Sequence, residues 1–115
     1  KNLSLEEDPV YLLNHLDLTS DSSEELTIAP GFFRTRVSIA GNKKIILPSF
    51  KDLYPGWWCQ IFLTTNSLVS FEPAQGLEVK YSKGTEAKHL NTLNGVCGVK
   101  YMGNSSWHIS GYNSK

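Results

Sequence analysis

The chain has 115 residues, of which 40% are hydrophobic and 19% are charged, and its formal net charge is zero. This composition is typical of one folded globular domain and excludes a disordered chain. The longest apolar stretches, such as residues 45–47 and 57–63, are far too short to span a bilayer, so we expect no membrane insertion. Residues 1–20 also lack the basic start and apolar run of a secretion signal.

The charges are unevenly distributed along the sequence. Residues 1–30 carry seven acids against one base, a net charge of −6, whereas residues 31–115 carry ten bases against four acids, a net charge of +6. An acidic segment ahead of a basic body favours contact between the two, within one chain or between neighbours. The alternative is that both are solvated surfaces. Because the bases are scattered rather than clustered with aromatic residues, we expect no nucleic-acid binding.

Residues 1–25 differ from the rest and predict an N-terminal arm and linker ahead of a β domain over residues 26–115. Asp8 followed by Pro9 is a good helix start, and it predicts a short helix over residues 10–16. Two helical turns are not stable alone, so this segment must either dock on something or remain disordered. The arm side chains that we expect to bind a partner are Val10, Tyr11, Leu12, Leu13 and Leu16.

From Leu26 onward the pattern predicts β structure. Residues 34–40 alternate, which places Val37 and Ile39 on one face of a strand. The Gly41–Asn42 pair predicts a two-residue hairpin turn into a second strand over residues 43–47. Pro48 ends that strand because it cannot donate to a sheet ladder.

A Pro-Gly turn at residues 55–56 opens a long strand over residues 57–65, which is apolar on both faces and which we expect at the centre of a sheet. Neighbouring residues of a strand point to opposite faces. We therefore expect one of Trp57 and Trp58 in the core and the other covered by a neighbouring chain or by the arm; a ligand platform is the remaining alternative.

Further strands are predicted over residues 68–71, 77–81, 87–90, 96–102 and 106–110. In the last of these, Trp107 and Ile109 should face inward and His108 outward. Short strands with turns every few residues are typical of antiparallel all-β folds. The expected fold is a small antiparallel β-sandwich or jelly-roll-like barrel of about eight strands, preceded by the arm with its short helix.

We find no sequence motif that carries catalysis. There is no nucleophile elbow, phosphate loop, paired-histidine helix or EF-hand spacing, and His15, His89 and His108 are isolated. Cys59 and Cys97 lie inside apolar strand patterns, which favours buried free thiols over zinc ligands or a disulfide. We therefore expect no enzymatic activity, no cofactor and no metal.

Four stretches follow one another in an order that resembles a small β-module of tailed-bacteriophage virion proteins. They are residues 44–49 (KIILPS), 54–63 (YPGWWCQIFL), 69–76 (VSFEPAQG) and 103–111 (GNSSWHISG). In that family a strand ends in Leu-Pro, a Pro-Gly turn opens a second long strand, and an aromatic strand closes the module. The resemblance covers about residues 34–111.

The resemblance implies a non-enzymatic structural protein of the virion. Its expected role is a capsid decoration or cement subunit that binds the major capsid protein or other virion proteins, as a dimer or trimer. A tail-fibre or head-fibre module that recognises a host receptor or glycan is the alternative. A small enzyme or carbohydrate-binding module unrelated to phage is a third reading. The residues expected to bind partners are the arm side chains named above together with Trp57 and Trp58.

Overall fold

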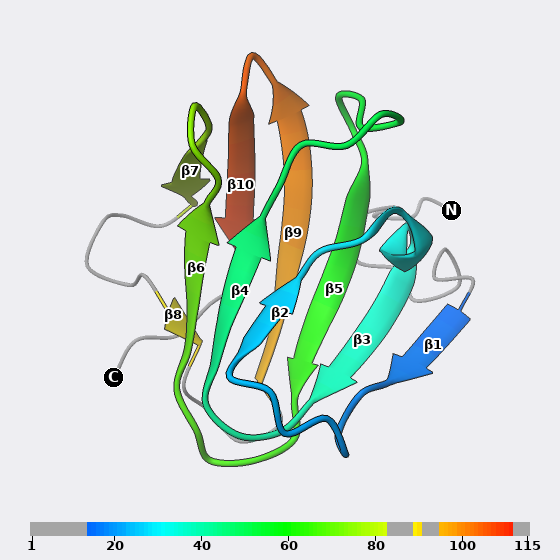
Figure 1. The fold of residues 1–115 in the computed structure, drawn as a ribbon, viewed down its shortest axis with the longest axis vertical. Coiled ribbons are helices and arrows are strands. Elements are labelled where there is room, and N and C mark those ends of the chain that lie inside the picture. Colours follow the sequence, from blue (N-terminus) through cyan, green and yellow to red (C-terminus); the bar gives the residue numbers. More distant parts are fainter. Residues whose placement is uncertain (1–13, 83–88, 91–94, 112–115) are drawn as a thin grey trace, which may run out of the picture.

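A computed structural model describes residues 14–82, 89–90 and 95–111 of the chain (Figure 1). Within these ranges the structure is built from strands, with one short 3-10 helix, η3 (Pro30–Phe32), so the predicted all-β class is confirmed. In the described part, no helix is long and apolar enough to cross a membrane.

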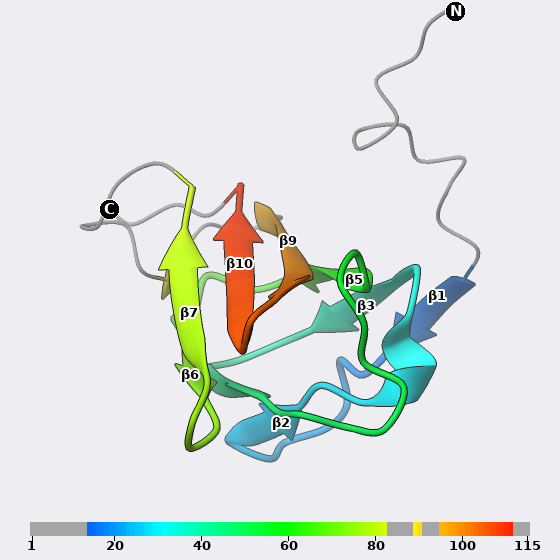
Figure 2. The ribbon, with the colours of Figure 1, turned by 90° about the horizontal axis from the view of Figure 1, so that it is seen from above.

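The strands form two sheets that face one another (Figure 2). Sheet A has six strands, in the spatial order β1 (Asn14–Asp17), β3 (Thr35–Ile39), β5 (Trp58–Leu63), β9 (Gly95–Gly103), β10 (Ser106–Ser110) and β7 (Glu78–Tyr81). Sheet B has four, in the order β2 (Glu25–Thr27), β4 (Lys43–Leu47), β6 (Val69–Pro73) and β8 (His89–Leu90).

The first six strands alternate between the two sheets, so the chain winds in successive coils. Strands β1, β3 and β5 pair in parallel in sheet A, and β2, β4 and β6 do the same in sheet B. Strand β9 then pairs antiparallel with both β5 and β10, while β7 joins β10 in parallel. The expectation of an antiparallel fold is therefore wrong for most of the strand pairs. Each coil returns through the opposite sheet, and that return supplies the crossover that parallel strands require.

The Gly41–Asn42 turn shows why the hairpin predicted there does not form. It carries the chain from β3 in sheet A to β4 in sheet B, and its hydrogen bonds go to the next coil. The Gly41 amide donates to Thr65 Oγ1 at 2.8 Å, and Asn42 Oδ1 accepts from the Leu68 amide at 2.8 Å. Gly41 has a φ of 83°, which glycine adopts without strain. The corner thus stacks one coil on the next instead of pairing its own two strands.

Residues 14–25, assigned to the arm from sequence, contribute β1 and the first residue of β2 to the two sheets. The helix predicted over residues 10–16 is wrong at residues 14–16, which belong to β1; the rest of that prediction lies outside the described residues. A strand forms here because residues 14–17 pair with residues 35–38 of β3 in register. Such long-range pairing overrides a weak local helix signal.

Lys43 holds the segment between β1 and β2 against the body. Lys43 is only 5% exposed. Its side-chain ammonium donates to the Asp21 carbonyl oxygen at 2.8 Å and also to the Ser23 carbonyl oxygen. Replacing Lys43 with methionine keeps the aliphatic stem but leaves both carbonyls without this donor. We expect the free energy of unfolding to fall by about 1–3 kcal/mol, measured by urea unfolding. The neighbouring Lys44→Met is the control, since Lys44 is exposed and should have little effect; equal effects of the two would contradict this role of Lys43.

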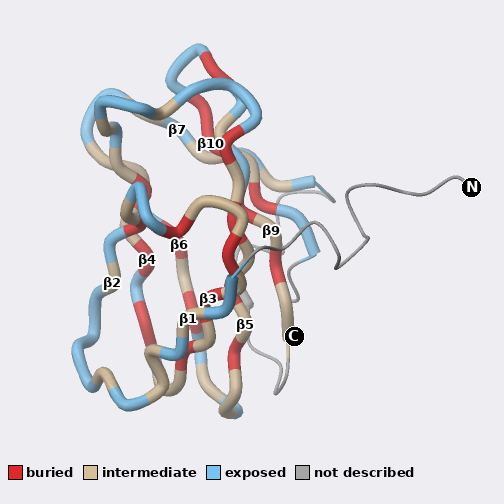
Figure 3. The backbone as a smooth tube through the Cα atoms, turned by 90° about the vertical axis from the view of Figure 1, so that its right-hand side faces the viewer, coloured by how far each residue is buried: buried red, intermediate tan, exposed pale blue. Residues whose placement is uncertain are grey.

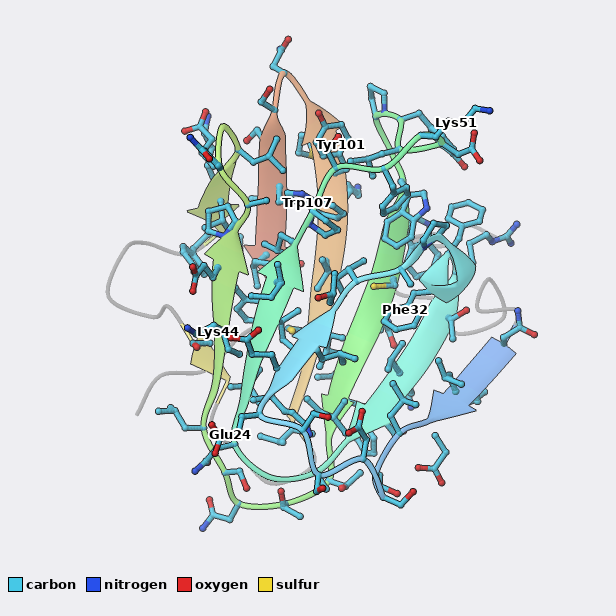
Figure 4. All side chains as sticks on the ribbon, viewed as in Figure 1. Glu24, Phe32, Lys44, Lys51, Tyr101 and Trp107 are labelled. Atoms are coloured by element: carbon cyan, nitrogen blue, oxygen red, sulfur yellow. The ribbon has the colours of Figure 1, made fainter. Side chains whose placement is uncertain are left out.

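The core lies between the sheets and takes alternate residues from β3, β4, β5, β6, β9 and β10 (Figure 3). Val37 and Ile39 are fully buried, as predicted, and so are Trp107 and Ile109. Trp57 is 2% exposed and packs edge-on against Trp107, with ring centroids 5.8 Å apart. Trp107 also packs against Tyr101 at 5.3 Å (Figure 4). One of the two adjacent tryptophans is therefore a core residue, as expected.

Candidate functional site: a groove on the outer face of sheet A

The outer face of sheet A carries two rows of side chains that run across neighbouring strands. In the first row, Trp58 on β5 lies opposite Lys100 on β9, which lies opposite His108 on β10. In the second row, Gln60 on β5 lies opposite Gly98 on β9, which lies opposite Ser110 on β10. Directly opposite residues on adjacent strands have Cβ atoms about 4.5–5.5 Å apart, so these side chains converge on one small area.

Gly98 creates a depression at the centre of this area because it contributes no side chain. The resulting groove has a volume of about 480 Å³. Its lining includes Trp58, Gln60, Gly98, Lys100, His108 and Ser110. A Cβ atom built on Gly98 would lie 3.1 Å from Ser110 Oγ, so even an alanine would narrow the groove. The volume falls within the about 300–1,000 Å³ that is usual for small-molecule sites.

One wall of the groove is held in place by side-chain contacts from the neighbouring strand β3. Arg36 Nε donates to Gln60 Oε1 at 3.1 Å. The Arg36 guanidinium also lies over the Phe62 ring, 5.4 Å from its centroid. These contacts fix the Gln60 carboxamide by its oxygen, which leaves its amide nitrogen available to donate toward the groove.

The charged side chains in and around the centre of the groove are basic. Lys100 is exposed, it has no acidic partner within the described residues, and no acid is among the groove's lining residues. On this face Lys80 lies opposite His108, and Arg36 lies opposite Gln60. The acidic residues of sheet A lie on its edge strands, Asp17 on β1 and Glu78 on β7. The centre of the face therefore favours an anion.

The structure separates the residues that the sequence proposed as partner-binding. Trp57 is buried in the core, Trp58 is half-buried on the outer face of sheet A, and Leu16 packs against the core from β1. Val10, Tyr11, Leu12 and Leu13 lie outside the described residues. Among the described members of the proposed set, Trp58 alone lines the groove.

The remaining groove residues were missed from sequence. Several of them come from β9 and β10, which pair antiparallel through a tight turn at Asn104 and Ser105, both with positive φ. Strand β9 contributes Gly98 and Lys100, and β10 contributes His108 and Ser110. Their alternation with buried residues marks them as outward-facing, but only the pairing of β9 with β5 brings them to Trp58. The usable signal was a glycine at an outward position of a long strand, which marks a close approach or a depression.

Cys59 and Cys97 are free and buried, as predicted, on the inner face of the same strands. Burial raises the pKa of the Cys59 thiol far above its ordinary value, and the nearby Cys97 adds to the increase. Burial also raises the pKa of Cys97, to about 12, although a hydrogen bond with the Ile61 backbone opposes this. Neutral buried thiols are poor nucleophiles and poor metal ligands. In the described ranges, no three or more His, Cys, Asp or Glu side chains gather where they could hold a metal ion.

The chain has no match among protein-family models, and no curated protein or solved structure shows significant similarity to it.

Proposed function

We propose that this chain is a non-enzymatic structural protein of a bacteriophage virion, a capsid decoration or cement subunit that works as a homo-oligomer on the major capsid protein. The resemblance of residues 34–111 to virion β-modules supports this role. We further assign the two facing sheets to a small β-sandwich-type module with open sheet edges.

The observation that carries the proposal is the open, acidic end of the two sheets. Strands β1 and β2 are the first strands of their sheets, and each has one edge with no strand partner among the described residues. Unpaired strand edges are ready templates for another chain. Asp17, Glu24 and Glu25 lie in or directly beside these two strands and are exposed, and Figure 4 shows Glu24. Such an end, preceded in the sequence by residues 1–13 with three acids and one base, suits attachment to a basic neighbouring surface.

Two aspartates at this end, Asp17 and Asp21, have a pKa lowered by local hydrogen bonds. Hydrogen bonds from the Thr19 hydroxyl and amide, at 2.6 and 2.9 Å, lower the pKa of Asp17 below its ordinary value. The Ser23 amide donates to Asp21 at 2.9 Å and lowers the pKa of that carboxyl. These two carboxylates therefore stay charged to lower pH than an ordinary aspartate, which suits an electrostatic contact.

Deleting residues 1–13 tests the attachment. This deletion leaves β1 intact, whereas a deletion of residues 1–25 would remove β1 and part of β2 and would damage both sheets. We expect the shortened protein to fold but to bind empty capsids of its phage at least about tenfold more weakly in co-sedimentation, a loss of about 1.4 kcal/mol.

The matched control is deletion of residues 112–115 at the other end of the chain, which should leave capsid binding unchanged. Unaltered binding after loss of residues 1–13 would contradict attachment through the N-terminal segment. A protein that is monomeric by light scattering both in solution and on release from capsids would contradict the homo-oligomer.

The tail-fibre or head-fibre alternative is favoured by one observation, the groove beside Trp58. A half-buried indole at a groove that also carries polar side chains is suited to a receptor ligand. The tail-fibre form of this alternative predicts that the protein co-purifies with tails rather than with capsids when disrupted virions are fractionated.

A further inference from the structure

We infer that the groove on the outer face of sheet A is a binding site for a pyranose sugar that carries a carboxylate, such as a uronic acid at the end of an oligosaccharide. The inference rests on Trp58, Gly98, Lys100 and their neighbours, and it holds whether or not the protein decorates a capsid. It concerns a ligand on the body, whereas the proposed capsid attachment concerns residues 1–13.

Trp58 supplies the apolar contact. It opens β5 on the outer face while its neighbours Trp57 and Cys59 are buried, so its ring is not used by the core. An indole offers a large, rigid apolar face at low conformational cost. The axial hydrogens on one face of a pyranose ring are apolar and can stack on such a surface, whereas the hydroxyl groups at the ring's edge need polar partners.

Polar side chains line the groove together with Trp58. The Gln60 amide nitrogen, the Ser110 hydroxyl and the His108 imidazole come from the two strands that flank β9. Gly98 leaves the floor between them bare, so a ring can approach the sheet closely. This arrangement matches a ligand with a flat apolar face and several hydroxyl groups better than it matches a peptide that adds as a β-strand, which would need an unpaired strand edge.

Lys100 selects the charge of the ligand. Its strand neighbours in register are Trp58 and His108, and none of the groove's described lining residues is an acid. An ammonium beside the stacking platform can pair with a carboxylate in a charge-assisted hydrogen bond. Lys80 and Arg36 on the flanking strands add positive potential without lining the groove themselves.

The test is isothermal titration calorimetry of the full chain with a glucuronate-terminated disaccharide and with its neutral glucose-terminated counterpart. We expect the charged sugar to bind about tenfold more tightly than the neutral one at low salt. Trp58→Ala should weaken binding of both sugars about tenfold. Lys100→Met should remove the preference for the charged sugar and leave binding of the neutral one.

Gly98→Ala fills the floor without removing any contact group, and it should weaken both sugars as Trp58→Ala does. Its Cβ meets only the Ser110 hydroxyl, which lies on an exposed side chain and can turn aside, so folding should persist. Lys51→Met is the matched control for loss of a positive charge, since Lys51 is exposed and lies outside the groove; it should change neither sugar.

Circular dichroism and thermal unfolding establish that each variant is folded. The inference is overturned if the folded wild-type protein binds neither sugar at millimolar concentration. It is also overturned if folded Trp58→Ala and Gly98→Ala variants bind as the wild type does. The assignment of a carboxylate to the ligand would be overturned if the wild type bound both sugars with equal affinity and Lys100→Met changed neither affinity. A synthetic peptide of residues 1–13 that binds the groove more tightly than either sugar would overturn it in favour of an acidic peptide.

Discussion

Replacing Trp107 with alanine is expected to lower the free energy of unfolding by about 3–5 kcal/mol, the usual cost of deleting a large buried aromatic side chain. Trp107 is fully buried and touches the rings of Trp57 and Tyr101. Its Nε1 also donates to the Pro48 carbonyl at 3.2 Å, which ties sheet A to the end of β4 in sheet B. The change should be read from urea unfolding followed by far-ultraviolet circular dichroism, because the substitution alters tryptophan fluorescence.

Two further variants separate the causes of that loss. Trp107→Phe keeps an aromatic ring but removes the donor to Pro48, so its cost should be clearly smaller than that of alanine. Met102→Ala removes an exposed side chain, 52% accessible, and should change stability by no more than about 0.5 kcal/mol. If Trp107→Ala cost no more than Met102→Ala, the aromatic cluster would not be the centre of the core.

The second large effect is a loss of stability at alkaline pH caused by the buried cysteines. Burial raises the pKa of Cys97 to about 12 and that of Cys59 further. In the unfolded chain a thiol ionises near pH 8.5, so the unfolded state releases protons that the folded state retains. The stabilisation that each buried thiol adds to the free energy of unfolding is complete below about pH 8.5. It is lost as the pH rises toward the pKa of the thiol in the folded state. The free energy of unfolding should fall by up to about 1.4 kcal/mol per pH unit for each thiol.

Lysine and tyrosine also titrate in this range, so the prediction is a difference between two proteins. The Cys59→Ala/Cys97→Ala variant will be less stable at neutral pH because it loses two buried sulfur atoms. Its stability should nevertheless fall less steeply than that of the wild type between pH 9 and 11. If the free energy of unfolding fell equally steeply with pH in the two proteins, the thiols would be accessible in the folded state.

The positions of most strands could be predicted from local sequence. The strands expected over residues 43–47 and 106–110 match β4 and β10 residue for residue. Alternation and turn residues are local signals, and both survive in the fold because one face of each strand is buried. Strands β1 and β2 were missed because they are short, polar and at the sheet edges, where burial imposes little pattern.

Strand pairing could not be predicted in the same way. A strand of alternating residues such as β3 can pair in either direction, and its partner in sheet A, β5, begins about one coil later in the sequence. The direction of pairing depends on the corner at Gly41 and Asn42. This corner forms hydrogen bonds with Thr65 and Leu68, which lie in the next coil of the chain. Since pairing determines which outward residues meet, the groove could not be predicted either, apart from Trp58.

The central claim is that the outer face of sheet A around Gly98 is the ligand-binding surface of this protein. The most direct measurement is a titration of the ¹⁵N-labelled full chain with the glucuronate-terminated disaccharide, followed by amide chemical shifts. We predict that the largest changes fall on Trp58, Gln60, Gly98, Lys100 and Ser110, while the outer face of sheet B at Lys44 and Ser70 is unaffected. Changes confined to sheet B, or none at saturating sugar, would contradict the claim.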